Sequence, residues 1–122
     1  MKKNVFRIAA VAALILSAFA MLATAQPDQI AGGYGNASTR DKAVRRAARV
    51  AVQQHSKREH PAVTLVKIVK AEQQVVAGMN YRLCMRVRQP GQKTHTVTAV
   101  VYEPIRKPMR LTNWKEGGCT DL

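Results

Sequence analysis

Apolar residues change their spacing twice along the chain, and each spacing predicts a different element. Residues 8–22 form an almost unbroken apolar run, preceded by three basic residues and followed by the small residues 23–25. This arrangement is typical of a secretory signal peptide. A retained membrane anchor is the alternative, but spanning a bilayer needs about 20 apolar residues. We therefore expect a signal peptide over residues 1–25 and one small domain over residues 26–122.

Between residues 38 and 56, apolar side chains recur every three or four positions, which is the spacing of one helical face. The members of that face are Val44, Ala47, Ala48, Ala51 and His55. Ser38 is expected to cap the helix, with Asp41 three residues further on, and Pro61 prevents a continuation. The preceding residues 26–37 contain three glycines and no periodicity, so we expect a flexible arm there.

Four candidate strands follow the helix, over residues 62–76, 81–88, 95–102 and 109–114. They are rich in β-branched residues, and the second one alternates apolar and polar side chains. Strict alternation is typical of a strand with one face in water. One helix followed by successive hairpins predicts an α+β fold, in which an antiparallel sheet carries the helix across one face.

The tip between the first two strands is apolar, although turns normally carry polar residues. Its residues are Gln74, Val75, Val76, Ala77 and Gly78. Two valines at a tip expose apolar surface, which marks a binding site. Gly78 allows backbone dihedrals, and a close approach, that a Cβ atom would obstruct. We therefore expect this loop to contact a partner.

The loop has the pattern Q-x-V-x-G and so resembles the signature loop of the cystatins, which inhibit papain-like cysteine proteases. Other segments resemble plant cystatins in the same order: Gly32-Gly33, residues 47–56 (A-A-R-V-A-V-Q-Q-H-S, against L-A-R-F-A-V-x-x-H-N), residues 80–83 (N-Y-R-L), residues 101–104 (V-Y-E-P, against V-W-E-K-P) and residues 111–114 (L-T-N-W). The resemblance covers nearly all of residues 26–122. It implies a sheet of five antiparallel strands wrapped around one long helix.

The resemblance also implies reversible, competitive inhibition by occlusion of the protease cleft. The arm with Gly32 and Gly33 would lie along the unprimed subsites, and the first loop would enter the cleft. The second hairpin, with Pro104 and Ile105, would cover the primed side. Inhibitory cystatins usually have Pro-Trp at this last position. Since tryptophan is a common interface anchor, inhibition here is expected to depend more on the first loop and the arm.

The charge leaves a second function open. Without the first 25 residues, 17 Lys and Arg stand against 7 Asp and Glu, a net charge of +10 that attracts anionic partners. The alternatives are therefore a non-inhibitory cystatin-fold protein or a basic secreted anion-binding or antimicrobial protein. Aromatic residues make up only 5%, which argues against a nucleic-acid surface. We expect no membrane association after signal removal, and a monomer, with a domain-swapped dimer as the alternative.

Cys84 and Cys119 are the only cysteines, and export to an oxidising compartment favours a disulfide between them. Closing a loop of this length would contribute about 3.5 kcal/mol; two free thiols or an intermolecular bridge remain open. Three histidines lack the spacing of a metal site. We expect no enzyme activity, no metal and no cofactor. We also expect the protein to be located outside the cell, or in the periplasm if the source is a Gram-negative bacterium.

Overall fold

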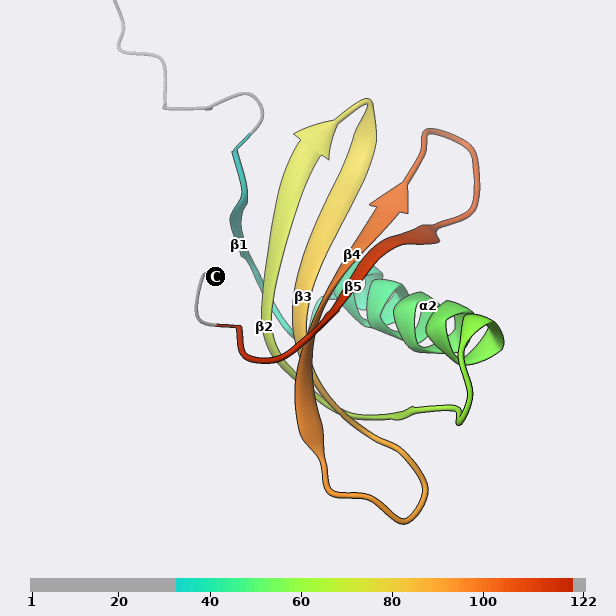
Figure 1. The fold of residues 1–122 in the computed structure, drawn as a ribbon. Helices are drawn as coiled ribbons and strands as arrows, with labels where there is room; N and C mark the ends of the chain where they lie inside the picture. The colour runs from blue at the N-terminus through green and yellow to red at the C-terminus, as the bar shows by residue number, and fades with distance from the viewer. Residues whose placement is uncertain (1–32, 120–122) are drawn as a thin grey trace, which may run out of the picture.

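The computed structural model describes residues 33–119. The predicted signal peptide and Gly32 lie outside these residues. The elements in chain order are β1 (Gly35–Ala37), α2 (Lys42–Arg58), β2 (Thr64–Val76), β3 (Gly78–Arg88), β4 (His95–Glu103) and β5 (Arg110–Glu116). The strands form one five-stranded sheet in the order β1-β2-β3-β4-β5, and every neighbouring pair is antiparallel. The helix lies across one face of this sheet (Figure 1), which confirms the predicted α+β fold.

The helix begins later than predicted. Asp41 is the N-cap residue, and its carboxylate accepts a hydrogen bond from the amide of Ala43 at 2.9 Å. The predicted cap at Ser38 is wrong. The Ser38 hydroxyl instead accepts from the amide of Arg40 at 3.1 Å, and its carbonyl accepts from the amide of Asp41. Ser38 thus begins a turn that leads into the helix, because a short polar side chain suits such a turn as well as a cap.

Part of the expected flexible arm is a strand. Gly35–Ala37 pairs with Ala71–Gln73 at the edge of the sheet. Backbone hydrogen bonds hold this strand pair together. The strand therefore forms without the periodic apolar residues whose absence led us to expect a flexible arm. The guanidinium of Arg82 also lies 4.0 Å from the ring centre of Tyr34, a cation–π contact. The arm is therefore held against the sheet from Tyr34 onward.

The core lies between the helix and the inner face of the sheet. All five residues of the predicted helical face are buried, and small alanines let the helix approach the strands closely. The largest fully buried side chains are Leu83, Met85, Val44, Val87, Val97 and Val101. His55 stacks on Trp114, with ring centres 3.8 Å apart and planes 7° apart. The burial of His55 on the helical face is as its spacing predicted.

The strand order determines which loops meet. In an antiparallel meander, alternate turns lie at the same end of the sheet. The β2–β3 and β4–β5 turns therefore share one end, and the β3–β4 turn lies at the other (Figure 1). Among residues 33–119, no helix combines the length and the apolar character needed to cross a membrane.

Candidate functional site

Three predicted segments lie at one end of the sheet. The first loop, Gln74–Gly78, joins β2 to β3, and Pro104 and Ile105 lie in the turn from β4 to β5. The register of β1 with β2 pairs Gly35 with Gln73, so the exposed Gly33 continues toward the first loop. Figure 1 shows β1 beside β2, with the N-terminal end of β1 nearer to that tip. The described residues of all three predicted binding segments thus lie toward the same end of the sheet.

The tips of both hairpins expose apolar side chains. Val75 keeps 69% of its surface exposed and Ile105 keeps 66%, and Val76 is also exposed. Pro104, next to Ile105, is half-buried. Surface of this kind is unfavourable in water, so its concentration at one end favours a contact with a partner there.

Gly78 fits against the base of the second hairpin. Its φ is +105°, in the region that favours glycine. A Cβ atom at this position would overlap the carbonyl oxygen of Glu103 and would lie 3.2 Å from the Cα of Pro104. Gly78 therefore makes a close approach within the molecule, between its two hairpins.

Side chains from neighbouring strands brace the first loop. The Asn80 amide donates to the side-chain oxygen of Gln74 at 3.0 Å, and the Tyr102 hydroxyl donates to the carbonyl of Ala77 at 2.6 Å. The sequence did not indicate Asn80 and Tyr102 as contacts of the loop. These two residues are direct cross-strand partners, which only the register reveals.

An ion pair ties the helix to the second hairpin. Arg46 reaches Glu103 at 2.9 Å, and both side chains keep contact with solvent. Burial raises the pKa of the nearby Tyr81, the charge of Glu103 raises it further, and Arg46 partly opposes this. Beyond the pair, Arg106 and Lys107 are exposed at the tip, so this hairpin presents positive charge.

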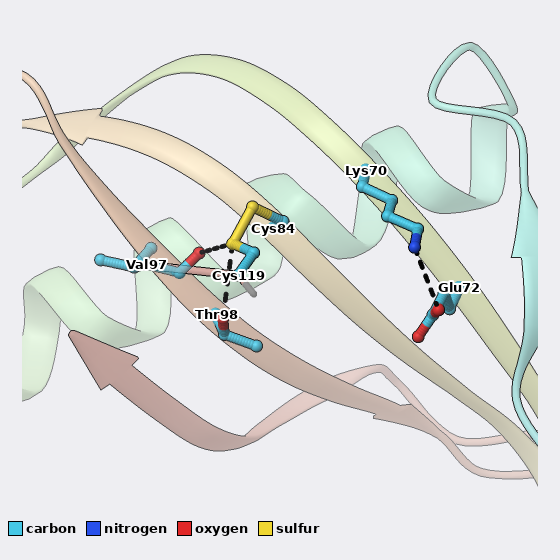
Figure 2. The surroundings of a disulfide bond; sticks show 6 residues. All are labelled: Lys70, Glu72, Cys84, Val97, Thr98 and Cys119. Atoms are coloured by element: carbon cyan, nitrogen blue, oxygen red, sulfur yellow. Dashed lines mark hydrogen bonds and ion pairs between the residues drawn. A yellow bond between two sulfur atoms is a disulfide. The ribbon is translucent and has the colours of Figure 1, made fainter. Parts of the chain in front are cut away.

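The outer face of the sheet, away from the helix, carries the disulfide. Cys84 on β3 is bridged to Cys119, with Cα atoms 5.7 Å apart, so the predicted intramolecular pairing is confirmed. Figure 2 shows the bridge beside β4, where the Thr98 hydroxyl donates to the sulfur of Cys119 at 3.5 Å. The same view shows Lys70 beside Glu72. The bridge fastens the C-terminal segment across the sheet.

Basic residues gather on the same outer face. Lys67 and Arg86 are direct cross-strand partners, and Arg88 follows on the same side of β3. None of these three has an ion pair among residues 33–119. Glu72 instead pairs with Lys70 and Arg82. The outer face therefore carries positive charge that no described carboxylate neutralises.

Two histidines lie outside the helix and differ in their surroundings. His60 is exposed, whereas His95 is half-buried and its side chain lies 3.0 Å from the carboxylate of Glu116. The alternation of β4 places His95 on the inner side, where the end of β5 supplies a carboxylate. Within the part of the chain that the structure describes, no group of three or more His, Cys, Asp or Glu side chains could hold a metal ion.

Comparisons with known proteins define the class. Residues 37–116 match the family model described as "Aspartic acid proteinase inhibitor". Cysteine proteinase inhibitor 7 of Arabidopsis thaliana is 42% identical over 65 residues, which cover 53% of this chain and 28% of that protein. Cysteine proteinase inhibitor 3 of the same plant is 35% identical over 69 residues, covering 57% of this chain and 55% of that protein. The chain thus spans between about a quarter and about half of these relatives' lengths.

A solved structure shares the fold. The salivary cystatin of the soft tick Ornithodoros moubata superposes with a TM-score of 0.58 at 22% identity, covering 73% of this chain and 100% of that one. The family match places the chain in a family of proteinase inhibitors and not in one of enzymes. More specifically, the chain belongs to the cystatin family.

Proposed function

We propose that this protein is a reversible, competitive inhibitor of papain-like cysteine proteases. The observation that carries the proposal is the convergence of the arm and two apolar hairpin tips at one end of the sheet. The names of the plant relatives support a cysteine protease as the target. In this assignment, Gly32 and Gly33 lie along the unprimed subsites, the first loop enters the cleft, and Pro104 with Ile105 covers the primed side.

The first loop supplies apolar contact area. Val75 projects into solvent, so its burial in a cleft removes apolar surface from water without first disturbing the core. Burial of about 100 Å² of valine surface contributes about 2.5 kcal/mol. Because the loop is braced from within by Asn80 and Tyr102, little of this free energy is lost in ordering it. No bond of the inhibitor needs to be cleaved for such occlusion.

The test is a titration of papain activity with the purified protein and two valine variants. Val75→Asp places a charge at the tip and is expected to abolish inhibition. Val66→Asp is the matched control, since Val66 is 53% exposed on the same strand but lies far from the tip. Val75 is a better target than Gly78, because a side chain at Gly78 would also displace the second hairpin.

Three outcomes separate the hypotheses. Inhibition that Val75→Asp abolishes and Val66→Asp preserves supports the proposal. Equal loss in both variants would show that the tip is not the binding surface. If the folded wild-type protein leaves papain active at micromolar concentration, the cysteine protease assignment fails. A parallel titration of pepsin then tests aspartic proteinases, the class in the description of the matched family model.

We also propose that the protein is secreted, or periplasmic in a Gram-negative host, after removal of residues 1–25. The disulfide between Cys84 and Cys119 supports an oxidising compartment. N-terminal sequencing of the exported protein should begin at Gln26. Gel filtration should give a monomer, and a dimer that dissociates only on unfolding would indicate domain swapping.

A second candidate function is anion binding by the outer face of the sheet. Like charges directly opposite each other destabilise a sheet, and Lys67 opposite Arg86 is such a pair. A sulfated polysaccharide is a suitable probe, because this face supplies cations that no described carboxylate pairs. The triple variant Lys67→Ser, Arg86→Ser, Arg88→Ser should lose binding to it at physiological salt. The control removes three charges from the helix, with the substitutions Lys42→Ser, Arg45→Ser and Arg49→Ser. Equal loss in both variants would mean that net charge alone governs binding.

A further inference from the structure

A row of side chains crosses four strands just below the two hairpin tips. The register aligns Gln74 on β2, Asn80 on β3, Tyr102 on β4 and Arg110 on β5 as successive cross-strand partners. Neighbours in this row touch at two points. The Asn80 amide donates to Gln74, and the guanidinium of Arg110 lies 5.2 Å from the ring centre of Tyr102. The row thus connects the first loop to the strand that leaves the second hairpin.

Tyr102 is the member of this row that reaches the loop backbone. Its hydroxyl donates to the carbonyl of Ala77 at 2.6 Å, across 25 positions of sequence. Ala77 is the residue between Val76 and Gly78, which pair with each other at the end of the hairpin. This bond therefore holds the tip at its turning point. It acts beside the place where Gly78 packs too closely against Glu103 for a Cβ atom to fit, so the first loop meets the second hairpin at two points.

We propose that Tyr102 is a positioning residue that holds the first loop in its binding conformation; this rests on the function proposed above. The hydroxyl is used within the molecule, so Tyr102 acts through the loop that it holds. Without this bond the tip samples more conformations, and binding must then order it. A typical hydrogen bond corresponds to about a 2- to 10-fold change in an equilibrium constant.

Tyr102→Phe tests this role, because it removes only the hydroxyl and keeps the ring beside Arg110. Thr112→Val is the matched control. The Thr112 hydroxyl also donates to a backbone carbonyl, that of Val100 at 3.1 Å, but it joins β5 to β4 away from the first loop. Each variant is measured for papain inhibition, for thermal unfolding, and for hydrogen–deuterium exchange of loop amides in the free protein.

We expect Tyr102→Phe to raise the inhibition constant by about 2- to 10-fold, mainly through faster dissociation. Exchange at Gly78 and its neighbours should become faster, and Thr112→Val should change neither quantity. Unchanged inhibition and exchange in Tyr102→Phe would overturn the inference while leaving the proposed function intact. If wild-type protein does not inhibit papain, the proposed function fails, and loop exchange alone still decides whether Tyr102 holds the tip. A similar rise of the inhibition constant in both variants would also refute a specific role.

Discussion

Replacing Gly78 with alanine separates two reasons for a glycine at this position. One is its backbone, since φ is +105°, and the other is its contact with the carbonyl of Glu103. Gly117 provides the matched control, because its φ is +112° and nothing lies within 4 Å of a Cβ atom built there. Alanine at Gly117 therefore adds only backbone strain, whereas alanine at Gly78 adds the same strain and a steric overlap.

The magnitudes follow from these two terms. Alanine at such a φ costs about 1–3 kcal/mol, which is the whole expected loss for Gly117→Ala. Forcing an extra methyl group against a packed backbone costs a further 1–3 kcal/mol or so. The free energy of unfolding of Gly78→Ala should thus fall by about 2–6 kcal/mol. The hairpins would also move apart, so inhibition should weaken at temperatures where the variant is still folded.

Urea denaturation of the two variants and the wild type measures this difference. The midpoints should shift while the slope with denaturant stays constant, since the area exposed on unfolding is unchanged. Equal losses for Gly78→Ala and Gly117→Ala would refute the reasoning, because backbone strain alone would then explain both. Normal inhibition by a folded Gly78→Ala protein would show that the loop tolerates displacement from the second hairpin.

Three other changes test separate parts of the molecule. Ile105→Trp should strengthen papain inhibition about tenfold, since tryptophan is a frequent interface anchor; an unchanged inhibition constant would mean that the second hairpin does not reach the enzyme. Replacing both Cys84 and Cys119 with serine should lower the free energy of unfolding by about 3.5 kcal/mol, and a urea midpoint equal to that of the wild type would contradict this. Burial raises the pKa of Tyr81 in the folded state. The resulting contribution to stability is complete below about pH 10, which is the pKa of tyrosine in the unfolded chain. It is lost at higher pH, because the unfolded state releases the proton first. Tyr81→Phe should therefore show a weaker fall in stability above pH 10 in alkaline unfolding curves; identical curves would refute this role of Tyr81.

The periodic parts of the fold could be predicted from the sequence, and the non-periodic parts could not. The helical face and the alternation of β3 follow from spacing alone, because each buries one side. The strand β1 has only three residues, exposes two of them and carries no pattern. The predicted start of the helix was wrong because Ser38 and Asp41 both suit a cap. The choice between them depends on the pairing of β1 with β2, since this strand ends directly before Ser38.

The candidate site was predicted in the same uneven way. Val75 and Val76 stand out as apolar residues at a turn. Pro104 and Ile105 were expected only from the resemblance to cystatins. The residues that support them do not stand out, since Tyr102 and Ala77 meet only when the register of β3 and β4 is fixed. Gly78 was expected to allow a close approach to a partner. The neighbour that the structure shows is Glu103 on the second hairpin, which no local pattern could indicate.

The stacking of Trp114 on His55 gives the protein its own optical reporter. The chain contains a single tryptophan, and its indole joins β5 to the helix in the middle of the molecule, away from both hairpin tips. The fluorescence of Trp114 should therefore change when the helix separates from the sheet, and it should stay unchanged when a protease binds the hairpin tips. A variant that loses inhibition while keeping this emission has lost its binding surface and kept its fold.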